Sequence, residues 1–235
     1  MTKSDMDYER ALQEINAINA AKHRRNHPLW ISLLGGEFSH EQVCEFLRQF
    51  SVIPLYNHYF HGPLYVNCPS PKWRARMAEV VYEEGTGHLY SNGVPHWQLF
   101  LQLGEAFGIT AEEMYATEYG PGALSVRAYL TAVCARSFIE GVAATSLAGE
   151  AQVPGTAGKL SEVFVENYGL TRDQAKFYSV HEEADQDHSD AGLEFLSEFA
   201  KTDMDLELVV RTVHDAVQVM WAMYSDIQER VSEIA

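Results

Sequence analysis

Apolar residues recur with helical spacing along most of the chain, and no clear strand-like alternation is present. Recurrence every three or four residues buries one face of an α-helix, whereas a half-buried strand alternates every second residue. The pattern predicts helices over 5–25, 39–66, 71–84, 95–108, 122–150, 156–168, 171–200 and 203–233. With no linker or repeat in view, we expect one all-α domain over residues 1–235, built from about seven to nine helices.

Capping residues and prolines mark where some of these helices begin or break. Ser39 and Gln42 have the spacing of a capping box, in which each side chain bonds the other residue's backbone. Proline lacks the amide hydrogen that an internal helical position donates. Pro54 and Pro63 should therefore kink or split the helix predicted over 39–66.

The charge balance is strongly acidic, with 33 Asp and Glu against 17 Lys and Arg and a formal net charge of −16. Binding to nucleic acid or to an anionic membrane needs basic surface, so we expect neither partner. Three widely spaced cysteines argue against a disulfide framework. The first residues lack an apolar signal segment, and no apolar stretch reaches about 18 residues, so we expect a cytoplasmic protein.

The segment HEEADQDH, residues 181–188, carries the most distinctive chemistry. On a helix that turns about 100° per residue, Asp185 lies about 40° and His188 about −20° from His181, so the three share one narrow face. Glu182 lies about 100° away and points sideways. Two imidazoles and a carboxylate on one face can bind a metal ion, but such a stripe also arises by chance on an acidic helix. The stripe alone leaves both interpretations open.

Two further segments offer metal ligands, which a helix-bundle site would draw from several helices. Glu84 ends one predicted helix, and His88 and His96 follow it. Glu150 ends an otherwise apolar stretch of small residues, where a buried carboxylate needs a partner. A solvated helix end is the alternative interpretation in both places.

Several segments, taken in order, resemble the haem-oxygenase-like superfamily, in particular its PqqC- and CADD-like branch, which includes di-iron oxidases and oxygenases. They are HPLW followed by GEFSHEQVCEFLRQF, then SPKWRARMAEVVYEEG, HWQLFLQLGEAFGI, GEAQVP and VHEEADQDHSDAG. The resemblance covers about residues 27–200. It implies a haem-oxygenase-like helical bundle and, in the di-iron members, six metal ligands in the order Glu, His, Glu, His, Asp, His.

Carried onto this chain one at a time, the implied metal ligands are Glu84, His96, Glu150, His181, Asp185 and His188. The loop between the first two is longer than usual for the family, so Glu83 and His88 are competing assignments. Glu140 is a weaker rival to the second glutamate. Three histidines and three carboxylates suit two Fe(II) ions, with manganese as the alternative. The resemblance also implies O2 as a co-substrate.

The resemblance implies a non-haem di-iron oxidoreductase that makes or modifies a small amine or an amino-acid-derived metabolite in a biosynthetic pathway. N-oxygenation, desaturation and C–C cleavage occur in the superfamily, and CADD-like members are linked to p-aminobenzoate synthesis from a tyrosine and a lysine of their own chain. Lys159 either matches that lysine or is a solvated surface residue. No tyrosine in FSVIPLYNHYFHGPLYVN, residues 50–67, is singled out.

Alternatives stay open for the activity and for several side chains. A cofactorless PqqC-like oxidase or a TenA-like hydrolase would need no metal, and Cys134 is the candidate cysteine for the hydrolase. His58 and His61 are interpreted as surface or substrate contacts in preference to metal ligands. Arg136 would pair either a substrate carboxylate or a nearby glutamate. The substrate is expected to be a small molecule, and the oligomeric state, a homodimer included, is left open.

Overall fold

The computed structural model describes residues 6–234, and the side chains of all of these except 183–191. This part of the chain contains twelve α-helices and one π-helix and no strand, so the all-α prediction is confirmed, with more helices than the expected number. The short helices α2 and α7 were not predicted. The α-helices are α1 (Tyr8–Ala21), α2 (Pro28–Leu34), α3 (His40–Phe50), α4 (His58–Asn67), α5 (Pro71–Thr86), α6 (His96–Ala106), α7 (Ala111–Tyr115), α8 (Pro121–Arg136), α9 (Phe138–Val142), α10 (Ala157–Tyr168), α11 (Lys176–Phe199) and α12 (Asp203–Ser232). The π-helix is η2 (Ala143–Gly149), and η1 (Arg24–Asn26) and η3 (Glu150–Gln152) are 3-10 turns.

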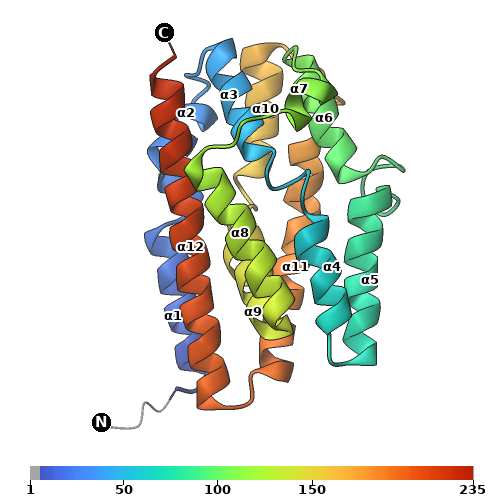
Figure 1. Ribbon diagram of the computed structural model, residues 1–235, viewed down its shortest axis with the longest axis vertical. Helices are drawn as coiled ribbons and strands as arrows, with labels where there is room; N and C mark the ends of the chain where they lie inside the picture. The colour runs from blue at the N-terminus through green and yellow to red at the C-terminus, as the bar shows by residue number, and fades with distance from the viewer. Residues whose placement is uncertain (1–5, 235) are drawn as a thin grey trace.

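The helix α12 runs along most of the long axis of the molecule and packs against α1, α2, α3 and α8 (Figure 1). Helix α11 packs against α6, α9 and α10, and η2 contacts both α11 and α12. On the other side of the bundle, α4 packs against α5, and α5 against α6. Over the described residues, no helix is both long and apolar enough to cross a membrane.

Helix α12 shows how the apolar pattern produces the core. It begins at a capping box in which the Thr202 hydroxyl accepts the Asp205 N–H at 3.2 Å and the Asp205 carboxylate accepts the Thr202 N–H at 2.9 Å. Such caps stabilise a helix by about 1 kcal/mol. Most of its buried residues are large and apolar, recur every three or four positions and form one face: Leu206, Val209, Val213, Val217, Met220, Met223, Tyr224, Ile227 and Val231.

The helix predicted over 39–66 is interrupted, as its prolines indicated. Helix α3 begins at the predicted capping box, and the chain then turns through 51–57 around Pro54 before α4 begins. Pro63 lies within α4 and does not break it. Because the turns separate the two helices, the inward face of α4 cannot be extrapolated from α3.

The prediction of one helix over 122–150 is wrong. Helix α8 ends at Arg136, and Ser137, with extended backbone (φ −155°, ψ 150°), caps α9. The chain then widens into the π-helix η2, most of whose residues are small and buried. Glu150 follows directly in η3. Single π turns occur often at functional sites, where they change the direction of the residues that follow.

Candidate metal centre

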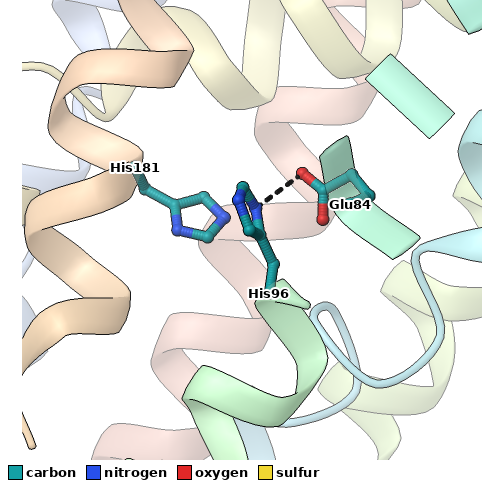
Figure 2. A group of neighbouring side chains, drawn as sticks. All are labelled: Glu84, His96 and His181. Atoms are coloured by element: carbon teal, nitrogen blue, oxygen red, sulfur yellow. Dashed lines mark hydrogen bonds and ion pairs between the residues drawn. The ribbon is translucent and has the colours of Figure 1, made fainter. Parts of the chain in front are cut away.

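Three side chains from three helices meet in the interior of the bundle (Figure 2). Glu84 lies near the end of α5, His96 is the first residue of α6, and His181 lies in α11. One ligand atom from each lies within 4.8 Å of the other two. The ring centroids of the two histidines are 4.7 Å apart. The structure therefore brings together three of the six residues predicted as ligands.

His96 is completely buried between two carboxylates. Its Nδ1 lies 3.1 Å from Glu84 Oε1, and its Nε2 lies 2.9 Å from Glu83 Oε1. Burial alone would lower the pKa of His96, but the Glu84 carboxylate and then Glu83 outweigh it and raise that pKa. Burial alone would raise the pKa of Glu84, and the His96 cation lowers it instead. The centre therefore holds an ionised Glu84 carboxylate in the interior, an arrangement that attracts a cation.

Glu83 holds the loop between α5 and α6. Its Oε2 accepts a hydrogen bond from the Leu89 N–H at 2.6 Å, and its Oε1 accepts one from the Tyr90 N–H at 3.1 Å. The Ser91 hydroxyl donates to the same Oε1 at 3.4 Å. Since this oxygen also faces His96 Nε2, one buried carboxylate connects the loop to the histidine.

The structure separates the competing assignments around this loop. Glu84 lines a cavity and accepts a hydrogen bond from Asn57 Nδ2 at 2.5 Å. His88 is exposed and packs against Tyr82, with ring centroids 5.7 Å apart. Glu84 and His96 thus belong to the buried cluster, whereas Glu83 supports it from behind and His88 faces outward.

The orientation of His181 comes from its own helix. Its Nδ1 lies 2.7 Å from the carbonyl oxygen of Phe177, one turn earlier, so that the Nδ1–H donates to this carbonyl. The hydrogen bond selects the tautomer whose lone pair is on Nε2, the atom available to a metal. The Phe177 ring packs against the imidazole, with centroids 4.3 Å apart. Metal-binding histidines are commonly oriented by such a bond to the opposite ring nitrogen.

A cavity of about 130 Å³ adjoins the cluster. Glu84 and His181 line it, together with His61 from α4 and Glu150 from η3. Glu150 Oε1 lies 3.6 Å from His61 Nε2. A fourth predicted ligand, Glu150, is therefore at the same cavity. Of the two interpretations given to His61, the position fits a substrate contact and not a surface residue, while His58 is exposed.

The remaining two predicted ligands lie farther along α11. The helical backbone confirms the helix predicted through residues 181–188. The side chains of Asp185 and His188 lie outside the described residues. Glu182, expected to point sideways, accepts hydrogen bonds from the Gly155 and Gly158 N–H groups at 2.5 and 2.8 Å. It therefore holds the segment that leads into α10.

The other candidate side chains are engaged elsewhere. Glu140 pairs with Arg136, whose Nε lies 3.0 Å from each carboxylate oxygen. Of the two partners considered for Arg136, the structure therefore shows a nearby glutamate and not a free position for a substrate carboxylate. Lys159 is exposed and lies 3.4 Å from Glu162. Burial raises the pKa of the Cys134 thiol to about 12, which makes it a poor nucleophile. None of these described side chains lines the cavity.

The donors of the cluster fit iron. Two histidines and one carboxylate form the donor set typical of non-haem Fe(II) oxygenases, in which open positions remain for O2 and substrate. His96 and His181 each have a hydrogen-bond acceptor at one nitrogen, Glu83 and the Phe177 carbonyl, so the other nitrogen can face a metal.

The architecture is shared with solved structures. A domain of unknown function with a haem oxygenase-like fold, from Shewanella denitrificans, matches with a TM-score of 0.77 at 16% identity. The match covers 97% of this chain and 95% of that one. The predicted haem-oxygenase-like fold is therefore confirmed.

Sequence comparison decides the family. The profile of the iron-containing redox enzymes matches residues 44–221, which include all six predicted ligands. The chain belongs to the iron-containing redox enzyme family. This iron-containing redox enzyme is also 24% identical to two proteins named 4-aminobenzoate synthase. One, from Chlamydia muridarum, aligns over 199 residues, 83% of this chain and 80% of the relative. The other, from Nitrosomonas europaea, aligns over 230 residues, 92% and 90% of the two chains.

Membership agrees with the sequence predictions at the level of the reaction class. The predicted oxidoreductase class and the prediction of iron are both supported by membership of the iron-containing redox enzyme family. In this iron-containing redox enzyme, the cluster of Glu84, His96 and His181 is the place where the described side chains can bind such a metal.

Proposed function

We propose that the chain is a non-haem di-iron oxidase or oxygenase that uses O2 to make or modify a small amine or amino-acid-derived metabolite in a biosynthetic pathway. The observation that carries this proposal is the cluster of Glu84, His96 and His181 beside a largely apolar cavity. Bound iron would supply O2 activation and one-electron transfer. The residues of the chain would bind the metal, orient the substrate and exclude bulk water.

The proposed metal ligands come from four segments: Glu84, His96, Glu150, His181, Asp185 and His188. The first ion would bind the three residues of the described cluster. Glu150 of η3, which lines the same cavity, would bind the second ion together with Asp185 and His188 of α11. Manganese suits the same oxygen and nitrogen donors.

The proton positions follow from the hydrogen bonds around the two imidazoles. A metal bound at His96 Nδ1 would leave the proton on Nε2, where Glu83 Oε1 accepts it at 2.9 Å. The proton of His181 would stay on Nδ1, hydrogen-bonded to the Phe177 carbonyl. Both rings would then be neutral, and the carboxylate behind His96 would raise its basicity as a ligand.

The names of the two 4-aminobenzoate synthases suggest 4-aminobenzoate as one candidate product. If the chain consumes one of its own tyrosines, as the CADD resemblance implies, the structure favours Tyr224, which lines the cavity. Tyr59 and Tyr65 are exposed, and so is Lys159. Intact-mass and peptide mass spectrometry after exposure to Fe(II) and O2 would locate any residue consumed.

Iron loading tests the proposal directly. After anaerobic incubation with Fe(II) and removal of excess metal, we expect two iron ions per chain and O2 uptake by the reduced protein. His181→Ala should lose at least one iron while keeping its helical circular dichroism. The control His214→Ala changes a half-exposed histidine on α12 that lies beside Asp215. Unchanged iron content in His181→Ala would contradict the ligand assignment, and O2 chemistry without bound metal would favour the cofactorless alternative.

A further inference from the structure

The cavity has a second polar region, formed by donors instead of ligands. Arg24, in η1, is 7% exposed and lines the cavity with Trp30 and Tyr178. Its Nη2 donates to the Gly149 carbonyl at 3.0 Å. Its Nε has no hydrogen-bond partner among the described residues, and the same is true of Trp30 Nε1 and the Tyr178 hydroxyl. Trp30 is fully buried and Tyr178 is 3% exposed. Three buried donors without an acceptor therefore belong to side chains that line one cavity.

Arg24 also has no direct carboxylate partner among the described residues. The chain has 33 acidic residues, yet none of the described carboxylates forms an ion pair or hydrogen bond with this guanidinium. Its Cζ lies 5.2 Å from the centroid of the Trp30 ring, whose face interacts with the cation. A buried cation that lacks a counter-charge is costly, and an anionic ligand would remove that cost.

We propose that Arg24, Trp30 and Tyr178 form a subsite for the carboxylate of a small monocarboxylic acid whose apolar part fills the cavity. This proposal rests on the proposed function and specifies the class of its substrate or product. An ionised carboxylate only accepts hydrogen bonds, so it matches three donors that have no acceptor. Arginine is the side chain that binds carboxylates most strongly, through charge-assisted bonds in a planar geometry.

The subsite is placed to direct the bound acid toward the metal cluster. Tyr178 and His181 are three residues apart on α11, so they are neighbours on one helix face, separated by a rise of about 4.5 Å. The cavity, about 130 Å³, is close in size to an engineered cavity of about 150 Å³ that binds benzene. A carboxylate on one six-membered ring, or on a short branched chain, is therefore the expected ligand. 4-Aminobenzoate is an acid of this size.

Benzoate binding to the metal-free chain tests the subsite without contribution from iron. Isothermal titration should give tighter binding of benzoate than of benzamide, which has the same ring and no charge. Arg24→Gln should weaken benzoate binding about tenfold to hundredfold and remove the preference over benzamide. Arg172→Gln, at an exposed arginine, is the control and should behave as wild type.

A second variant covers a loss of structure in Arg24→Gln, which also removes the contact with Gly149. Tyr178→Phe deletes a hydroxyl that bonds no described residue, and it should weaken benzoate binding several-fold and reduce the preference for benzoate over benzamide. Equal binding of benzoate and benzamide by wild type, or wild-type affinity for benzoate in Tyr178→Phe, would overturn the proposal.

The two proposals can fail separately. A chain that binds two irons but does not distinguish benzoate from benzamide would keep the di-iron function and lose the carboxylate subsite. A chain that prefers benzoate through Arg24 but binds no iron would keep the subsite and lose the di-iron function.

Discussion

Replacing Glu83 by glutamine would change a single group at the point where the loop after α5 and the ring of His96 are both held. The carboxylate is 1% exposed, and all of its described partners are donors. Oε2 accepts from the Leu89 N–H, and Oε1 accepts from His96 Nε2 and the Tyr90 N–H. Glutamine keeps the shape but replaces one acceptor by an NH2 donor. Whichever way the amide turns, the NH2 group meets at least one N–H group that it cannot bond.

The size of the effect follows from those contacts. Losing a hydrogen bond to a charged group costs about 1.5–3 kcal/mol, and a buried donor left without an acceptor costs about 1–3 kcal/mol. We therefore expect Glu83→Gln to lower the free energy of unfolding by about 3–5 kcal/mol. Because Glu83 also orients His96, iron affinity should fall about 10- to 100-fold.

Urea unfolding of the metal-free chain, followed by circular dichroism near neutral pH, measures the first effect, and Fe(II) titration measures the second. Glu79→Gln is the matched control, since Glu79 lies one turn earlier on α5, is 57% exposed and pairs with Arg76 at 3.0 Å. A surface pair of this kind contributes about 0–1 kcal/mol. If Glu83→Gln were no less stable than Glu79→Gln, the role assigned to the buried carboxylate would be wrong.

Three further predictions concern residues around the centre. His96→Ala should lose at least one iron ion and His88→Ala should keep both in metal analysis, because only His96 is in the buried cluster; the reverse result would place the ligand in the loop. The Arg136 hydrogen bond lowers the pKa of Glu140 in the folded chain, so its contribution to stability is present above the ordinary Glu pKa of about 4.3 and is lost as pH falls through the lower folded pKa. The difference in unfolding free energy between wild type and Glu140→Gln should therefore shrink on acidification, and a constant difference would argue against it. Cys134 should not react with a thiol-specific disulfide reagent until the chain is unfolded, because burial raises its pKa to about 12; rapid labelling of the native chain would refute this.

Local signals in the sequence account for much of the helical architecture. The capping box of Ser39 and Gln42 is present as predicted, and so is the helix through residues 181–188, because both depend on spacing within a few residues. The helix end predicted near Glu84 and the helix start predicted near His96 are also present, as the end of α5 and the start of α6. These features can be predicted without knowing which helices pack against one another.

The features that the sequence left open depend on packing between helices. Adjacent residues on a helix point about 100° apart, so choosing between Glu83 and Glu84 requires the position of α6 relative to α5. His61 faces the cavity only because α4 starts after the irregular turns at 51–57, whose length sets the phase of the helix. The unpaired Nε of Arg24 could not be predicted from the sequence. Whether a buried arginine meets a carboxylate depends on which helices pack around it, and no local sequence pattern encodes that.

Because the π-helix η2 directly precedes Glu150, the number of residues in this segment determines where the Glu150 carboxylate lies. A π-helix holds about one more residue per turn than an α-helix. Deleting one residue between Ala143 and Gly149 would remove this extra residue, shorten the path to Glu150 and move its carboxylate relative to His61. A substitution among these small buried residues alters packing, whereas a deletion alters the position of a carboxylate. Residues 143–149 should therefore tolerate substitutions more readily than insertions or deletions.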